Sequence, residues 1–147
     1  MAASNIIYVD VVCDLFHPGH VGFLRQARAL GDALYVGVCS DEDVASYKPR
    51  PIMNMEERMT VLAACRYVDK VIPNAPLSCT RAWLDEIGAG YVCHGDDFPP
   101  DEMNYWYRDL IGTGRLKVVP YTQGVSSRDI IARVASRLKD GTLRIQL

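Results

Sequence analysis

The chain has 147 residues, of which 49% are hydrophobic and 23% charged, and its formal net charge is −2 at pH 7. That length suits one compact domain with its own core and is too short for two ordinary domains. The nearly neutral charge excludes a global field that would attract nucleic acid or an anionic membrane, so any anion site must be local.

The start of the chain and its cysteines predict a soluble, cytoplasmic protein without a membrane or nucleic-acid partner. Residues 1–5 lack the basic segment and apolar run of a signal peptide, and no window reaches the roughly 18 apolar residues of a membrane span. The five cysteines are odd in number and include no C-x-x-C pair. This pattern disfavours a disulfide framework or a zinc knuckle, and we expect buried free thiols.

Five short apolar runs alternate along the chain with segments of helical spacing. The runs cover residues 6–12, 33–38, 68–72, 91–94 and 116–119. Such alternation predicts a parallel sheet with crossover helices, and runs that are apolar almost throughout predict strands covered on both faces. We therefore expect one α/β domain over residues 1–147, with a five-stranded parallel sheet in the doubly wound order 3-2-1-4-5 and helices on both faces.

The turn His17-Pro18-Gly19-His20 follows the first predicted strand and precedes a helix-patterned stretch over 21–30. The start of that helix would present free N–H groups and the positive end of its dipole, which favour a nucleotide phosphate. Two imidazoles at this spacing can donate to phosphate oxygens, where charge grows during nucleotidyl transfer. The tetrapeptide alone is equally compatible with surface or N-cap histidines.

Apolar stripes at helical spacing predict three helices. They comprise Phe23, Leu24, Ala27 and Leu30, then Met55, Met59, Leu62 and Ala63, and finally Ile130, Ile131, Val134 and Leu138. Gly31 resembles a C-cap of the first helix. Arg58 lies on the second of these helices, where a surface ion pair is one expectation. Trp83, Tyr105 and Trp106 are expected to lie in the core or an interface.

Polar residues follow both strands that flank the predicted reversal of strand order. In a doubly wound sheet, ligands bind beyond the carboxyl ends of the strands at this switch point, between the first and fourth strands. The polar residues there are Asp14, His17 and His20 after the first strand, and His94, Gly95, Asp96 and Asp97 after the fourth. Their expected convergence favours the phosphate site over a pair of surface histidines.

A second phosphate cradle is predicted where the fifth strand leads into the last helix. Thr122, Gly124, Ser126 and Ser127 lie in this segment, and the serine hydroxyls can bond the β- and γ-phosphates. Simple capping of the last helix by Ser126 or Ser127 would explain one serine but rarely both. The tail 139–147 has little pattern, so it extends the last helix, adds an edge strand or is disordered.

Several spaced motifs together resemble the cytidylyltransferase family, over roughly residues 9–134. The motifs are Asp14 to His20, Leu24 to Arg28, Glu57-Arg58, Arg66 to Asp69, His94 to Asp97 and Gln123 to Ser127. The chain looks most like a phosphoethanolamine-using domain of that family. The resemblance implies a Rossmann-like nucleotidyltransferase fold, a homodimer, and CTP with Mg²⁺. It also implies in-line attack of an acceptor phosphate on the α-phosphorus, with loss of pyrophosphate and no covalent intermediate.

An ionised acceptor phosphate is already a nucleophile, so the protein need only align the reactants and neutralise charge. We expect His17 and His20 to donate to the α- and β-phosphate oxygens. The resemblance implies that Lys48 reaches both the acceptor and CTP, and that Arg58 lies near a dimer interface or the nucleotide. Asp14 would hold a histidine tautomer, cap the turn or face Mg²⁺. Asp96 and Asp97 would accept from cytosine or ribose or help to place the metal. The expected binding residues also include His94, Gly95, Gly19, Thr122, Gly124, Ser126, Ser127 and Arg128. No metal ligand is assigned.

Four positions depart from the family pattern. Val11 stands where glycine is usual, Cys13 where an aromatic residue is usual, and Tyr121 where an arginine commonly precedes the Thr-x-Gly motif. Arg128 replaces a serine or threonine and would return positive charge from another direction. These exchanges predict a reshaped pocket, and they leave open a phosphonate acceptor in place of a phosphate ester. A second carboxylate on such an acceptor would suit Arg128.

Two other functions share the H-x-G-H turn: an adenylyltransferase, and a nucleotide-sensing module that lost turnover. The motif His94 to Asp97 and the order of the other motifs favour cytosine over adenine. Val11 and Tyr121 favour the sensing module, whereas retention of both His17 and His20 argues against it. A metal hydrolase is disfavoured, because no third ligand lies at a recognisable offset from the two histidines.

Overall fold

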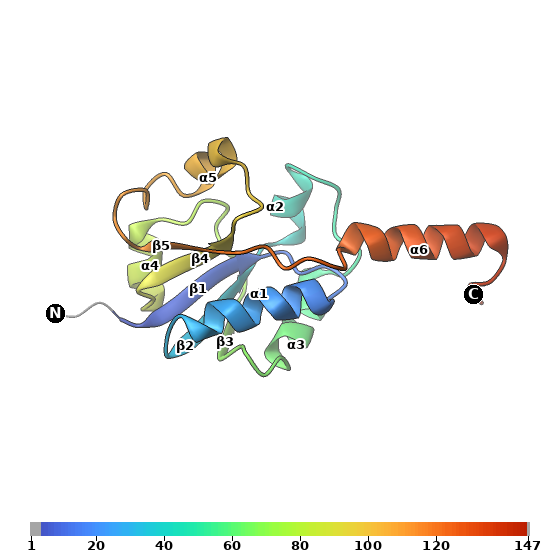
Figure 1. Ribbon diagram of the computed structural model, residues 1–147, viewed down its shortest axis with the longest axis horizontal. Coiled ribbons are helices and arrows are strands. Elements are labelled where there is room, and N and C mark those ends of the chain that lie inside the picture. The colour runs from blue at the N-terminus through green and yellow to red at the C-terminus, as the bar shows by residue number, and fades with distance from the viewer. Residues whose placement is uncertain (1–3, 147) are drawn as a thin grey trace.

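The computed structural model describes residues 4–146, and its core is one parallel sheet (Figure 1). The five strands run in the order β3-β2-β1-β4-β5, which confirms the predicted topology. Their bounds are β1 (Ile6–Val11), β2 (Ala33–Val38), β3 (Lys70–Ile72), β4 (Tyr91–Gly95) and β5 (Leu116–Val119). β1 is the central strand and pairs with both β2 and β4, so the carboxyl ends of β1 and β4 are adjacent at the switch point.

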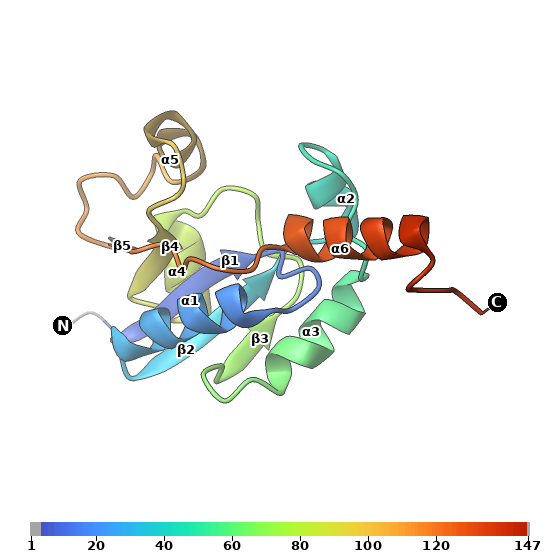
Figure 2. The same cartoon turned by 45° about the vertical axis from the view of Figure 1, so that its right-hand side comes forward.

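Helices cover both faces of the sheet (Figure 2). The helices of the chain are α1 (Pro18–Ala29), α2 (Asp41–Ala45), α3 (Met55–Ala63), α4 (Arg81–Ile87), α5 (Pro100–Trp106) and α6 (Ser127–Asp140), of which α6 covers neither face. Successive residues of β1 point to opposite faces. Ile7 and Val9 belong to the cluster under α1 and α3, whereas Tyr8 belongs to the cluster under α4. This two-sided burial accounts for the nearly continuous apolar character of the strand.

The ends of two predicted elements differ from expectation. α1 begins at Pro18 rather than Val21, because His17 caps it and proline suits the first helical position. Gly31 is not a left-handed C-cap, since α1 ends at Leu30 in right-handed geometry with φ −81°. Gly31 instead permits a close approach of two chain segments: a Cβ there would lie 2.3 Å from the Asn5 carbonyl oxygen.

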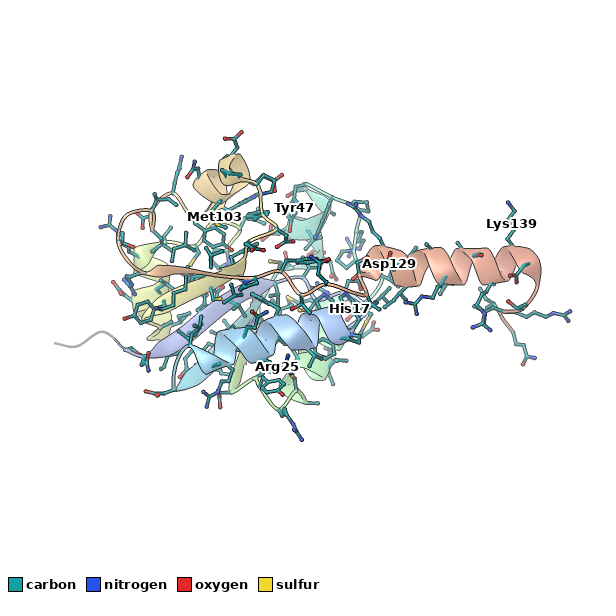
Figure 3. The ribbon with its side chains drawn as sticks, viewed as in Figure 1. His17, Arg25, Tyr47, Met103, Asp129 and Lys139 are labelled. Atoms are coloured by element: carbon teal, nitrogen blue, oxygen red, sulfur yellow. The ribbon has the colours of Figure 1, made fainter. Side chains whose placement is uncertain are left out.

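The last predicted helix is present as α6, but its apolar stripe does not pack against the core. α6 has no buried residue, and Ile131, Val134 and Leu138 are 42%, 43% and 39% exposed. The helix extends away from the sheet (Figure 3). It ends at Gly141, which is left-handed at φ 81°, and residues 142–146 form neither helix nor strand.

No helix in the described part of the chain combines the length and apolar character that a membrane crossing requires.

Candidate active site

The two histidines form a reciprocal cap at the start of α1. The Nδ1 atom of His17 accepts from the Gly19 amide at 3.1 Å, and the Nδ1 atom of His20 accepts from the His17 amide at 3.2 Å. Their rings stack with centroids 3.7 Å apart. Because each neutral ring accepts through Nδ1, its proton must be on Nε2. Both imidazoles therefore keep one N–H donor for a ligand.

Burial favours the neutral form of both imidazoles. It lowers the pKa of His17, and together with the neighbouring His17 ring it lowers the pKa of His20 to about 4. Gly19 allows the cap to be this tight, since a Cβ at that position would lie 2.8 Å from both His17 Cε1 and the Val125 carbonyl oxygen. The Gly19 amide is bonded within the cap, so fewer free backbone donors face the cavity than the sequence predicted.

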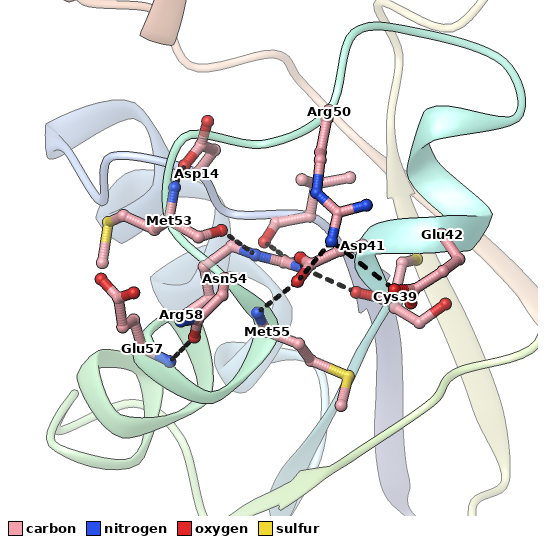
Figure 4. A network of polar contacts seen from close by, with 12 residues as sticks. Asp14, Cys39, Asp41, Glu42, Arg50, Met53, Asn54, Met55, Glu57 and Arg58 are labelled. Atoms are coloured by element: carbon pink, nitrogen blue, oxygen red, sulfur yellow. Dashed lines mark hydrogen bonds and ion pairs between the residues drawn. The ribbon is translucent and has the colours of Figure 1, made fainter.

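Asp14 anchors two segments rather than a histidine. Its carboxylate accepts from the amides of Ile52 and Met53 at 2.8 and 2.9 Å (Figure 4). Its carbonyl oxygen accepts from the Ser127 hydroxyl at 2.8 Å. Backbone amides, and not Asp14, determine the tautomers of the two histidines. Asp14 instead fixes the end of the loop that carries Lys48.

Arg58 lies beneath the same loop and directly behind two residues that line the cavity, Val12 and Cys39. Its residue exposure is 1%, and it donates to the carbonyls of Met53, Val12 and Cys39 and to Asp41 at 2.7 Å (Figure 4). The expectation of a surface ion pair was therefore wrong, because the pair with Asp41 is buried. A buried guanidinium with this full set of acceptors holds together the carboxyl ends of β1 and β2.

The residues after β4 divide into two groups. His94, Gly95 and Asp97 line the main cavity, and Asp96 is absent from its described lining. The Asp96 carboxylate accepts from the Tyr121 amide at 2.8 Å, which joins β4 to the segment after β5. The geometry of Asp96 therefore corresponds to a capped turn, whereas Asp97 remains available to a ligand.

Both serines at the start of α6 have local partners. Ser126 caps the helix by accepting from the Asp129 amide, and Ser127 donates its hydroxyl proton to Asp14. Capping of α6 therefore explains Ser126, and a tertiary hydrogen bond to Asp14 explains Ser127. The Ser126 hydroxyl still has a proton to donate, so it is the better of the two phosphate donors. Gly124 is absent from the described cavity lining, and its φ of 122° explains the glycine.

A single cavity of about 1150 Å³ joins these elements at the carboxyl end of the sheet. Its cationic and donor residues lie at the starts of α1 and α6 and on the loop after α2: His17, His20, Lys48, Thr122, Ser126 and Arg128. On another side, β1, the segment after β4, and α5 with the residue that follows it contribute acidic and aromatic residues: Asp10, Asp97, Phe98, Asp101, Glu102, Tyr105, Trp106 and Tyr107. The cavity therefore offers unlike environments for an anionic and a cationic group.

Asp10 is a candidate site residue that the sequence analysis missed. It accepts at Oδ1 from the Tyr107 hydroxyl at 2.5 Å. Burial raises the pKa of this carboxyl, while the Tyr107 hydrogen bond and nearby His94 oppose the shift. The signal was present in the sequence, because Asp10 is the one charged residue in the apolar run 6–12.

The aromatic residues of α5 have a cavity role that the sequence analysis did not foresee, although Trp106 also packs against the core as expected. Trp83 packs against the core as expected, but Tyr105 and Trp106 line the cavity. α5 buries none of its residues completely, which leaves their rings available to the cavity. Helical spacing alone could not distinguish a core stripe from a cavity wall.

The departures from the family pattern also lie at the cavity. Val11, Cys13, Tyr121 and Arg128 all line it. Burial lowers the pKa of Lys48, and Arg128 lies near enough to lower it further. The two cations therefore approach the same part of the cavity from different elements.

Comparisons with known proteins agree with this arrangement. A family model described as cytidylyltransferase-like matches residues 12–133. The chain is 37% identical over 135 residues to an ethanolamine-phosphate cytidylyltransferase of Dictyostelium discoideum, covering 91% of this chain and 38% of that protein. It is 42% identical over 134 residues to an ethanolamine-phosphate cytidylyltransferase of Arabidopsis thaliana, covering 87% of this chain and 32% of the relative.

The fold has a counterpart among solved structures. The lipopolysaccharide core biosynthesis protein from Thermoplasma volcanium GSS1 superposes with a TM-score of 0.63 and 23% identity, covering 82% of this chain and 98% of that one. That similarity concerns the fold alone. The chain spans 32 to 38% of the length of the two curated relatives described above.

Proposed function

The chain belongs to the cytidylyltransferase-like family, whose model matches residues 12–133, and on that premise we propose that it transfers CMP from CTP to a small phosphate acceptor. One observation carries the proposal: the histidine cap of α1 and the start of α6 open into the same cavity. Helix starts and N–H donors suit a triphosphate. The acceptor we propose resembles phosphoethanolamine, the substrate class in the names of the relatives.

In the proposed reaction, an oxygen of the acceptor phosphate attacks the α-phosphorus of CTP. A new P–O bond forms, the bond from the α-phosphorus to the bridging oxygen breaks, and pyrophosphate leaves with that electron pair. The Nε2–H groups of His17 and His20 would donate to non-bridging oxygens as their charge increases. Lys48 and Arg128 would neutralise the leaving group and the acceptor.

The far end of the cavity supports an acceptor that carries an ammonium group. Asp10 is an acceptor-only carboxylate when ionised, and Tyr107 occupies one of its oxygens. The other oxygen, with the face of Tyr105, would bind a primary ammonium. An acceptor with a second carboxylate would meet negative charge here, and the names of the relatives specify phosphate esters. The phosphonate alternative is therefore not favoured.

The cavity fits Mg²⁺ that arrives with the triphosphate. No group of three or more possible His, Cys, Asp or Glu ligands occurs among the described residues. Mg²⁺ commonly binds through substrate phosphates and only one or two carboxylates. Asp14 is occupied by two amides, which makes Asp97 the better candidate ligand. When bound, the ion would neutralise phosphate charge.

We also propose a homodimer and a reducing compartment such as the cytoplasm. The exposed apolar residues of α6 support association with another chain. The five free cysteines support a compartment that keeps thiols reduced.

The test is pyrophosphate release with Mg²⁺, each of the four nucleoside triphosphates, and a panel of acceptors. The panel comprises phosphoethanolamine, phosphocholine, glycerol phosphate and 2-aminoethylphosphonate, with mass spectrometry to identify the product. We expect CTP with phosphoethanolamine to have the highest kcat/KM. A preference for ATP would instead support the adenylyltransferase, and binding of CTP without product from any acceptor would support the sensing module.

A further inference from the structure

The loop that carries Lys48 is held firmly at its two ends. At its start, the amides of Tyr47 and Lys48 donate to the Val44 carbonyl at 3.2 and 3.1 Å, and the Val44 side chain is fully buried. At its end, Asp14 accepts from two loop amides. Residues 46–50, which include the two amides of the first anchor, are all exposed. The middle of the loop therefore has little contact with the core to restrict it.

Tyr47 provides a contact from this loop to α5. Its ring centroid lies 5.6 Å from that of Trp106, with an interplanar angle of 52°, and both residues line the cavity. Figure 3 shows Tyr47 on the side of the molecule where α5 lies. The ammonium of Lys48 lies 5.6 Å from the Tyr47 ring centroid, within range of a cation–π contact.

Trp106 is the fixed member of the pair. Its side chain packs against the core cluster under α4, and its carbonyl accepts from the Cys79 amide at 3.2 Å. Tyr47, in contrast, is 47% exposed. The contact therefore ties an exposed loop to a rigid wall of the cavity, directly beside Lys48.

We propose that the contact between Tyr47 and Trp106 holds Lys48 over the cavity, which makes both aromatic residues positioning residues for the proposed CMP transfer. The inference rests on that proposed function. A lysine is a mobile point charge on a flexible stem, so restricting the neighbouring backbone raises the fraction of molecules in which its charge reaches the phosphates. α5 also leads directly into Tyr107, which holds Asp10. The contact therefore links the two ends of the cavity.

The first test separates positioning from packing by substitution of Trp106. Trp106→Leu keeps an apolar side chain against the core but removes the aromatic face, whereas Trp106→Phe keeps that face. We expect Trp106→Leu to lower kcat about three- to tenfold, the effect of one aromatic pair, with Kd for CTP changed less than about twofold. Trp106→Phe should recover most of kcat. Ile111→Ala is the control, because Ile111 is 48% exposed and outside the described cavity lining.

The second test asks whether the effect passes through Lys48. In a Lys48→Ala background, Trp106→Leu should change kcat less than about twofold, because the charge that it positions is already absent. An equal fall in kcat with and without Lys48 would overturn the proposal.

The third test needs no turnover. Hydrogen exchange of the full chain without substrates should be about three- to tenfold faster for the amides of residues 45–48 and 50 in Tyr47→Ala and Trp106→Leu, with β1 and β4 unchanged. Unchanged exchange in that loop would refute the contact even in an active enzyme. If the proposed function is wrong, the wild-type protein will form no CMP-linked product, whatever the result of the exchange experiment.

Discussion

His17 and His20 each serve as a helix cap and as a ligand donor, through different ring nitrogens. Nδ1 accepts a backbone amide and thereby assigns the proton to Nε2. A carboxylate partner would have favoured an imidazolium, which burial here opposes. The site therefore relies on neutral donors, and Lys48 and Arg128 provide positive charge nearby.

Substitution of His20 by asparagine should separate these two roles. The shorter amide can still accept at the position of Nδ1, but it places no donor at the position of Nε2. We expect kcat to fall about 100- to 1000-fold, as for the loss of one preorganised donor to a developing charge. Kd for CTP, measured by calorimetry, should stay within about threefold. A fall in affinity as large as the fall in kcat would show that His20 binds the ground state equally well.

The lowered pKa of His20 makes stability depend on pH. The native pKa is about 4 and the ordinary value is 6.5, so the unfolded chain binds the proton more readily. The contribution to stability is fully present above pH 6.5 and is lost as the pH falls from 6.5 towards 4. We expect urea unfolding to show a loss of about 2 kcal/mol over this window. His20→Asn should flatten the profile there, and a wild-type profile that is already flat would contradict the assignment.

Asp10 should determine selectivity for an ammonium-bearing acceptor. Asp10→Asn removes the charge and keeps the approximate shape, so kcat/KM for phosphoethanolamine should fall about 10- to 100-fold. Glycerol phosphate lacks the ammonium, so its kcat/KM should change far less. The measurement is the ratio of the two kcat/KM values, and equal losses for both acceptors would exclude this role of Asp10.

At the scale of elements, the buried Arg58 joins the segments that shape the cavity. It bonds the ends of β1 and β2, the start of α2 and the residue before the N-cap of α3 (Figure 4). Asp14 joins the Lys48 loop to the start of α6 in a similar way. Neither residue needs to touch a ligand to determine where the ligand-binding groups lie.

Arg58→Met should destabilise the fold strongly. The thioether matches part of the side chain but leaves Asp41 and three buried carbonyls without their donor, so we expect the free energy of unfolding to fall by about 3–5 kcal/mol. The measurement is urea denaturation at pH 7. Arg50→Met is the matched control, because Arg50 is 61% exposed at its side chain and pairs with Asp41 at 3.8 Å. Its loss should cost less than about 1 kcal/mol, and a similar cost for both variants would refute the network.

At the scale of the whole molecule, α6 is the element that the rest of the chain does not stabilise. It has a complete N-cap and a left-handed glycine at its end, but no buried residue. An isolated helix of 14 residues is marginally stable in water. Association with a second chain would bury its apolar residues and supply the missing stability.

The proposed homodimer therefore predicts that the stability of α6 depends on protein concentration. Hydrogen-exchange protection of the α6 amides should rise between about micromolar and submillimolar protein, while protection of β1 stays constant. Sedimentation velocity should show the dimer over the same range. Protection of α6 that is independent of concentration, in a protein that sediments as a monomer, would refute the proposal.

The sequence by itself determined the elements of the sheet and the switch point. Strand and helix periodicities, Pro18 after a capping residue, and serines before the last helix are local signals, and local signals persist whatever the chain later packs against. They predicted β2 and β5 with the bounds that the structure shows. Chain order and the handedness of crossovers then left few topologies for a parallel sheet.

Only the tertiary structure decided which polar residues face the cavity. The Asp10 carboxylate accepts its hydrogen bond from Tyr107, which is distant in the sequence. The Asp14 carboxylate accepts from amides that lie 38 and 39 residues away. The apolar stripe of α6 looked like that of a core helix, because periodicity reports the existence of an apolar face and not its partner. Hydrogen-bond partners and burial are properties of segments distant in sequence, so no pattern within one segment can specify them.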